Sequence, residues 1–250
     1  MGTEREMATI AVYSLKGGVG KTTLAVNLAW SSAIQSSRRT LLWDLDPQGG
    51  ASYLIGDGKA MKDRAQAVFA KDVEPEKLIR PSTIERLDLL AADTSLRGLD
   101  RLFFTLDKKK RLAKLLESLA KHYDRVILDC PPGLTETSEQ VMRAADIILS
   151  PVIPSPLSER ALDEILSFLD RQSGRHAPIL PVFSMVDRRR ALHRAAMEGH
   201  ADWPVIPMAS AVEQMAIHRS AIGAFAPSSP AAQAFATLWK GIERRLTRTN

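Results

Sequence analysis

The most regular feature of the sequence is the alternation of short apolar runs with longer amphipathic segments. The runs are rich in Val, Ile and Leu and are apolar throughout, as strands are when both of their faces are buried. Their alternation with helix-length segments predicts βαβ units around a parallel sheet. The predicted strands are 9–14, 40–44, 87–91, 125–129, 147–153, 179–185 and 205–206.

The amphipathic segments between these strands predict helices that cover both faces of the sheet. They lie at 22–35, 108–122, 136–145, 158–172, 189–199, 212–220 and 230–246. The pattern weakens over 57–81, which we interpret as an excursion from the sheet with one helix around 61–70. The predicted fold class is therefore α/β, with a doubly wound, mostly parallel sheet and helices on both faces.

Length and composition favour one domain. The chain has 250 residues, of which 45% are hydrophobic, enough for one substantial core. We expect a single domain over 1–250, with 1–8 as a flexible N-terminal extension. No apolar stretch approaches the roughly 18 residues that span a bilayer, and Cys130 is the single cysteine, so a cytoplasmic protein is expected.

A glycine-rich turn separates the first predicted strand from the first predicted helix. Strand, glycine turn, Lys-Thr and helix together form the context of a phosphate-binding loop. Backbone N–H groups of such a turn and the helix N-terminus bind phosphate oxygens, so we predict an ATP site. Lys21 is expected to reach the β- and γ-phosphates, and the Thr22 hydroxyl to ligate Mg²⁺. The predicted nucleotide-binding residues of the loop are Gly17, Gly18, Val19, Gly20, Lys21, Thr22 and Thr23.

Two strands end in aspartates that can complete this site. Asp44 and Asp46 follow one strand, and Asp129 ends another. A carboxylate at the end of a strand beside a phosphate loop can hold Mg²⁺, directly or through water. Thr22, Asp46 and Asp129 are therefore the predicted metal-site residues. Asp44 lies two residues before Asp46 and would point to the same side of a strand, so the two could exchange roles.

The loop departs from the general phosphate-loop pattern, because Leu15 holds the position of the first glycine and Lys16 follows it directly. In this form it resembles the deviant Walker A motif of the ParA/MinD family of P-loop ATPases. The resemblance implies that Lys16 reaches across an ATP-dependent homodimer to the partner's phosphates. It also implies that Asp46 orients the attacking water. Lys16, Lys21 and Asp46 are accordingly the predicted catalytic residues.

The resemblance extends to the adenine pocket, where it implies contacts by Met185, Asp187 and Pro207. The match is looser here. Relatives often continue from this proline into an Arg-Asn-rich segment, whereas residues 208–211 of this chain are Met-Ala-Ser-Ala. The resemblance therefore supports the predicted base contacts less strongly than the predicted phosphate contacts.

Positive charge is concentrated in the last quarter of the chain. Over 188–250, nine Lys or Arg residues stand against four Asp or Glu residues, an excess that equals the whole net charge of +5. Such asymmetry favours a phosphate-backbone partner, and ParA-type ATPases bind DNA non-specifically as ATP dimers. The resemblance implies a ParB-like or cargo-adaptor activator and nucleoid association in the ATP state. The DNA-binding candidates are Arg188, Arg189, Arg190, Arg194, Arg219, Arg244 and Arg245.

Two other classes remain open at this level. A MinD-like membrane ATPase needs a terminal amphipathic helix, and the last predicted helix does carry an apolar stripe. A helix that packs against the core needs the same stripe, and a helix packed in the core cannot also insert into a membrane. We therefore expect no membrane association. The stripe consists of Phe235, Leu238, Trp239, Ile242 and Leu246. A metabolic enzyme on this fold is the third class, although one Cys130 per subunit excludes an interfacial four-iron cluster. The sequence does not identify a cargo.

Overall fold

The computed structural model describes residues 7–58, 64–106, 110–172 and 176–247. In these residues the strands form one sheet in the order β3-β4-β2-β5-β1-β6-β7-β8. All neighbouring strands are parallel except β3, which pairs antiparallel with β4 at one edge. The strands are β1 Ala8–Val12, β2 Thr40–Asp44, β3 Arg80–Pro81, β4 Leu87–Leu90, β5 Arg125–Asp129, β6 Ile147–Val152, β7 Ile179–Val186 and β8 Val205–Pro207.

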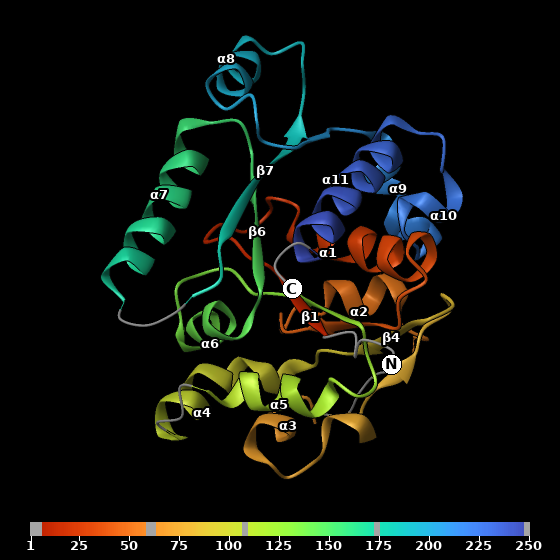
Figure 1. Cartoon of the computed structure of the whole chain (residues 1–250), viewed down its shortest axis with the longest axis vertical. Helices are drawn as coiled ribbons and strands as arrows, with labels where there is room; N and C mark the ends of the chain where they lie inside the picture. The colour runs from red at the N-terminus through yellow and green to blue at the C-terminus, as the bar shows by residue number, and fades with distance from the viewer. Residues whose placement is uncertain (1–6, 59–63, 107–109, 173–175, 248–250) are drawn as a thin grey trace.

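Helices cover both faces of this sheet, and α8 stands apart at one end of the molecule (Figure 1). One face packs against α1, α2, α9, α10 and α11, and the other against α3 to α7. The α-helices are α1 Lys21–Trp30, α2 Gly50–Ile55, α3 Ala67–Ala70, α4 Leu99–Leu106, α5 Arg111–Leu119, α6 Glu136–Ala144, α7 Pro156–Arg171, α8 Ala191–Gly199, α9 Ser210–His218, α10 Ile222–Phe225 and α11 Pro230–Leu246. Short 3₁₀ segments occupy Pro75–Lys77 and Thr94–Gly98, and a π-helical turn, Ser31–Gln35, extends α1.

Each central strand contributes side chains to two cores. In β1, Ile10 and Val12 point into the core beneath α1 and α11, whereas Ala11 belongs to the core beneath α5 and α6. In β2, Leu42 and Trp43 divide in the same way. This two-sided burial explains why the strands are continuously apolar, and it confirms the predicted α/β fold.

Several predicted boundaries need correction. The interval 57–81 is not wholly outside the sheet, because β3 occupies its last two residues. Residue 8 belongs to β1 rather than to a flexible extension, and 1–6 lie outside the described residues. Sequence reasoning also missed α2 and α4, which are short and lack a long apolar repeat. Of the helix predicted at 61–70, residues 61–63 lie outside the described residues and the helix is α3.

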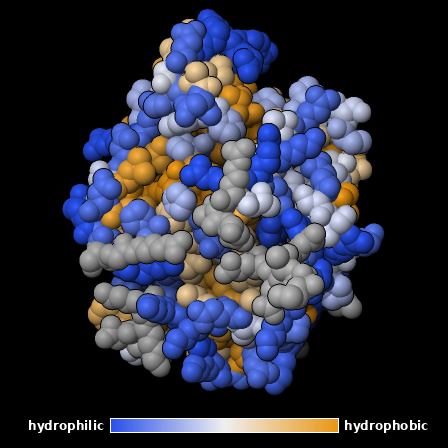
Figure 2. All heavy atoms as spheres, viewed as in Figure 1, coloured by the Kyte–Doolittle hydropathy of each residue, from blue (hydrophilic) through white to orange (hydrophobic). Residues whose placement is uncertain are grey.

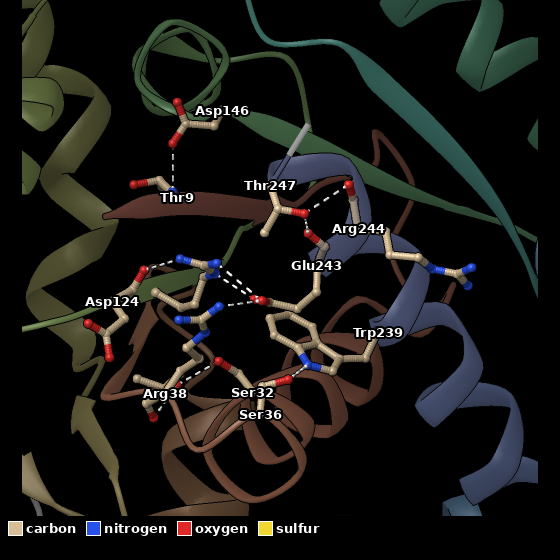
Figure 3. Close-up of polar contacts among 12 residues, drawn as sticks. Thr9, Ser32, Ser36, Arg38, Asp124, Asp146, Trp239, Glu243, Arg244 and Thr247 are labelled. Atoms are coloured by element: carbon tan, nitrogen blue, oxygen red, sulfur yellow. Dashed lines mark hydrogen bonds and ion pairs between the residues drawn. The ribbon is translucent and has the colours of Figure 1, made fainter. Parts of the chain in front are cut away.

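The last helix, α11, is fixed to the amino ends of β2 and β5 by a network of charges (Figure 3). Glu243 accepts hydrogen bonds from Arg125 Nε at 2.7 Å, Arg125 Nη2 at 3.2 Å and Arg38 Nη2 at 2.9 Å. Trp239 Nε1 also donates to Ser36 Oγ at 2.8 Å. These contacts place the C-terminal end of α11 beside the amino ends of the strands, on the side of the sheet opposite their carboxyl ends.

The apolar stripe of α11 is buried in the core. Its five residues are Phe235, Leu238, Trp239, Ile242 and Leu246, and none is more than 8% exposed. In this structure the stripe therefore packs against the sheet, as the core interpretation predicts. Among the described residues, no helix combines the length and hydropathy needed to cross a membrane.

Candidate functional site

The glycine-rich loop runs from the end of β1 to the start of α1 at the carboxyl edge of the sheet. Gly18 and Gly20 have φ values of +71° and +91°, in the left-handed region that favours glycine. A Cβ on Gly20 would also lie 2.9 Å from Ser184 Oγ. No side chain caps the N-terminus of α1, so its amides are available to phosphate oxygens.

Lys21 is held inside this loop. Its Nζ donates to the carbonyl of Lys16 at 2.7 Å, and the residue is 7% exposed. Burial lowers the pKa of Lys21, against the raising effect of the Asp129 and Asp46 carboxylates. A buried cation whose hydrogen bond, among the described residues, goes to its own loop fits an incoming polyphosphate. Lys16 is half-buried and Gly17 is exposed.

Two carboxylates lie next to the loop because β5 is the neighbour of both β1 and β2. The register sets Asp44 beside Asp129. Asp129 is fully buried, and neither of its carboxylate oxygens has a hydrogen-bond partner among the described residues. Burial raises the pKa of Asp129 well above its ordinary value, and the Asp44 carboxylate adds to the rise. The Thr22 hydroxyl lies close enough to oppose this rise in the pKa of Asp129, and a buried oxygen pair beside a hydroxyl fits a hydrated Mg²⁺.

Asp44 and Asp46 lie in different surroundings. Asp44 Oδ2 accepts hydrogen bonds from Ser52 N at 2.8 Å and Ser52 Oγ at 2.7 Å, and its Oδ1 accepts one from Asp46 N at 3.1 Å. Burial raises the pKa of Asp44 to about 6. Asp44 is thus occupied in holding α2 and the backbone of Asp46. Asp46 is only partly buried, which favours it over Asp44 for contact with a water molecule.

A small cavity of about 110 Å³ adjoins the phosphate loop through Gly20 and Thr23. Of the three predicted base contacts, Met185 and Pro207 line it. Met185 has a φ of +56° where the β7–β8 pairing is irregular, a strained backbone of the kind found at ligand sites. Sequence reasoning missed the other lining residues, because nothing in their spacing pointed to the cavity. They include Ser184, Val212, Glu213 and Phe235.

Asp187, the third predicted base contact, does not line this cavity. Its carboxylate accepts two hydrogen bonds from the Arg189 guanidinium, at 2.9 Å each. Those bonds lower the pKa of Asp187 to about 2. Its backbone N–H donates to His193 Nδ1 at 3.0 Å. Asp187 therefore shapes the loop between β7 and α8.

The seven candidate DNA-binding arginines fall into three separate places. Four belong to α8 and the loop before it, at the carboxyl edge of the sheet; hydrophilic atoms cover this end of the molecule (Figure 2). Arg244 and Arg245 lie near the opposite edge, next to the Glu243 network. Arg219 lies between α9 and α2. The structure thus does not form one basic patch from all seven.

Comparison with known proteins agrees with this geometry. A family model described as an AAA domain matches residues 7–180. The sporulation initiation inhibitor protein Soj of Bacillus subtilis is 36% identical over 162 residues, which are 63% of this chain and 63% of Soj. The chain thus matches just under two thirds of the length of Soj. A ParA family protein of Chlamydia pneumoniae is 31% identical over 248 residues, 94% of this chain and 97% of that protein.

A solved structure shares the fold over almost its whole length. It is the cobyrinic acid a,c-diamide synthase of Mycobacterium smegmatis with bound ATP analogue and magnesium. Its TM-score is 0.82 at 24% identity, with 98% of this chain and 97% of the synthase covered. At that identity the likeness shows the fold alone. The extended match to the Chlamydia protein, together with the phosphate loop and its buried aspartate, shows that the chain belongs to the ParA/MinD family of P-loop ATPases.

Proposed function

We propose that the protein is a ParA-like ATPase that forms an ATP-dependent sandwich dimer, binds DNA non-specifically and positions or segregates a cargo. Hydrolysis is slow and is stimulated by a ParB-like or cargo-adaptor protein, which releases the ATPase from DNA. The observation that carries the proposal is the joint placement of the Lys16–Lys21 loop, the buried Asp129 carboxylate and the half-buried Asp46 at the carboxyl ends of the strands. In the cell the protein is cytoplasmic and associates with the nucleoid in its ATP state.

Each residue of the site has a separate role in ATP binding or hydrolysis. The loop amides and Lys21 bind the phosphates of ATP, and Thr22 and Asp129 hold the metal site. Mg²⁺, when bound, neutralises charge on the β- and γ-phosphate oxygens. Asp46 orients the attacking water, while Asp44 keeps the Asp46 backbone in place through its 3.1 Å hydrogen bond. Lys16 contributes its cation to the partner's phosphates.

Two substitutions test these roles. Lys21→Ala should abolish ATP binding, because it removes the buried cation from the phosphate loop. Asp46→Ala should keep ATP binding, lose hydrolysis and trap the dimer. ATP affinity by calorimetry, phosphate release and mass by light scattering measure the three quantities. Normal hydrolysis by Asp46→Ala would refute the role given to Asp46.

For DNA, the arginines before α8 are better placed than those of α11. The loop that carries them leaves the carboxyl end of β7, the same edge as the phosphate loop, so a dimer formed through that edge brings two such loops together. Arg188 and Arg190 are exposed. Arg194 instead supports the loop, with Nη1 donating to the carbonyls of Arg188 and Arg189 at 3.0 and 2.9 Å. We therefore assign phosphate contacts first to Arg188 and Arg190.

A gel shift on random-sequence duplex tests this assignment. Binding should appear with ATP and not with ADP, and should fall steeply with salt, because each phosphate contact releases counterions. Changing Arg188 and Arg190 together to Ala should weaken binding and reduce the salt slope. The matched control changes Arg244 and Arg245 together to Ala at the opposite edge. Equal gel shifts with ATP and ADP would show that DNA binding does not depend on the nucleotide. Sedimentation of the protein with lipid vesicles in the presence of ATP would indicate a membrane ATPase instead.

A further inference from the structure

Arg219 joins two short helices that lie on the same face of the sheet. It follows α9 directly, and its guanidinium reaches the end of α2. Arg219 Nε donates to the Tyr53 carbonyl at 3.0 Å, and Nη2 donates to the Gly56 carbonyl at 2.8 Å. The guanidinium carbon also lies 5.2 Å from the centre of the Tyr53 ring. The two planar donors thus satisfy carbonyls that a helix end leaves without partners.

The backbone of Arg219 has a conformation that is unfavourable for a residue other than glycine. Its φ is +46°, in the left-handed region where glycine ends a helix without steric cost. A non-glycine residue held there points to a role for its side chain. Arg219 is exposed, yet two donors of its guanidinium are bonded to α2, so its side chain has specific partners within the chain.

The residue of α2 next to Tyr53, Ser52, is connected to the aspartates of the site. Ser52 of α2 donates to Asp44 through both its N–H and its hydroxyl, and Asp44 in turn accepts the Asp46 N–H. Ser52 Oγ also accepts the Ala92 N–H at 2.8 Å. A Cβ on Gly50, the first residue of α2, would lie 3.1 Å from Thr22 Cγ2. Displacement of α2 would therefore shift Asp44 and the surroundings of Thr22 together.

Helix α9 is connected to the cavity beside the phosphate loop. Val212 and Glu213, in its first turn, line that cavity together with Met185 and Pro207. Met215 lies one turn further and contacts the Asn27 amide of α1 through its sulfur, at 3.3 Å. A base in the cavity would therefore contact α9, the helix whose C-terminal end is fixed to α2 by Arg219.

We propose that Arg219 is a positioning residue that couples occupancy of the base cavity to the arrangement of Asp44 and Asp46. The path runs from α9 through the Arg219 guanidinium to the carbonyls of α2, and from Ser52 to Asp44. This inference rests on the proposed ATPase function and assigns a use to one arginine that the charge pattern had grouped with DNA contacts. The test measures the coupling itself.

The test compares the hydrolysis of two substrates by the wild type and by one variant. Arg219→Gly removes the guanidinium and keeps the left-handed backbone without strain, so the fold should persist. The maximal rate of hydrolysis, kcat, is measured with ATP and with an abasic ribose 5′-triphosphate. We expect the ratio of kcat for ATP to kcat for the abasic compound to fall at least about fivefold in Arg219→Gly, within the usual range of coupling between sites. Arg219→Lys, which retains charge without the planar fork, should behave like Arg219→Gly.

A matched control is Lys71→Gly. Lys71 also ends a helix in the left-handed region, at φ +71°, and is exposed, but it follows α3 on the other face of the sheet. Its substitution should leave the kcat ratio unchanged. An equal loss of kcat on both substrates in Arg219→Gly would indicate a purely structural role and overturn the inference.

A second measurement does not depend on hydrolysis. Amide hydrogen exchange in α2 is followed with ADP and with pyrophosphate, which differ by the nucleoside. In the wild type, ADP should protect α2 more than pyrophosphate does; in Arg219→Gly the difference should vanish. If the difference persists in Arg219→Gly, the coupling does not pass through Arg219, even where ATP is bound and hydrolysed normally. If neither ADP nor pyrophosphate binds, the proposed function fails instead.

Discussion

The charge network at the end of α11 gives the sharpest prediction for stability. Glu243→Ala would remove the acceptor of three hydrogen bonds and leave the guanidinium groups of Arg38 and Arg125 without their carboxylate. The Arg125 side chain is 6% exposed and that of Arg38 is 15% exposed, so water can replace Glu243 only in part. The substitution should therefore destabilise the fold much more than loss of a surface ion pair.

The expected magnitude follows from this burial. Removing one partner of a buried pair costs about 3–5 kcal/mol, because a buried charge is left uncompensated. Arg125 Nη1 keeps its hydrogen bond to the Asp124 carbonyl at 2.6 Å, which favours the lower end of that range. A loss of about 3 kcal/mol at roughly 2–4 °C per kcal/mol lowers the melting temperature by roughly 6–12 °C in a chain of this size.

Urea unfolding followed by tryptophan fluorescence measures the free energy of unfolding for wild type and Glu243→Ala. Glu117→Ala is the matched control, since Glu117 is an exposed residue of α5; its effect should stay within about 0.5 kcal/mol. The reasoning is refuted if Glu243→Ala costs no more than Glu117→Ala. That result would mean that water solvates both arginines after the substitution.

Three further predictions concern local geometry and pH. Gly20→Ala should destabilise the fold by about 1–3 kcal/mol and weaken ADP binding, because φ is +91° and the new Cβ would lie 2.9 Å from Ser184 Oγ; unchanged ADP affinity by calorimetry would contradict this. Gly223→Ala should cost about 1–3 kcal/mol in urea unfolding, because its Cβ would approach the Trp30 ring to 2.3 Å; a neutral result would show that the ring can move. Burial alone would raise the pKa of Glu243, but hydrogen bonds from arginines outweigh it and hold the pKa below its ordinary 4.5. The stabilisation is then complete above that value and is lost as pH falls through the folded-state pKa, so wild type and Glu243→Gln should converge in thermal unfolding as pH falls below 4.5; a constant difference would exclude this linkage.

The sequence predicted the central part of the molecule well because the local signals there are strong. Buried parallel strands appear in the sequence as uninterrupted apolar runs. A glycine turn followed by Lys-Thr, between a strand and a helix, is specific to phosphate-binding loops. Asp46 and Asp129 could be placed beside that turn because parallel strands present their carboxyl ends at one edge. Boundaries of short helices such as α2 depend on tertiary contacts, including the Ser52–Asp44 bonds, and left no periodic signal.

The surface could not be predicted in the same way. A count of charges treats all arginines alike, whereas the structure gives Arg219 and Arg189 specific partners within the chain and leaves Arg188 and Arg190 exposed. Which arginine finds a partner depends on helices that meet only in the folded protein. The base cavity is hidden for the same reason, since Phe235 joins it from the far end of the sequence.

The position of the last helix matters for how the protein can be observed in cells. Because Glu243 is bound at the amino ends of β2 and β5, whatever is attached behind residue 247 starts on the side remote from the glycine turn. A fluorescent protein fused there should leave the glycine turn accessible to nucleotide, so the fusion should keep the ATP affinity of the unmodified protein.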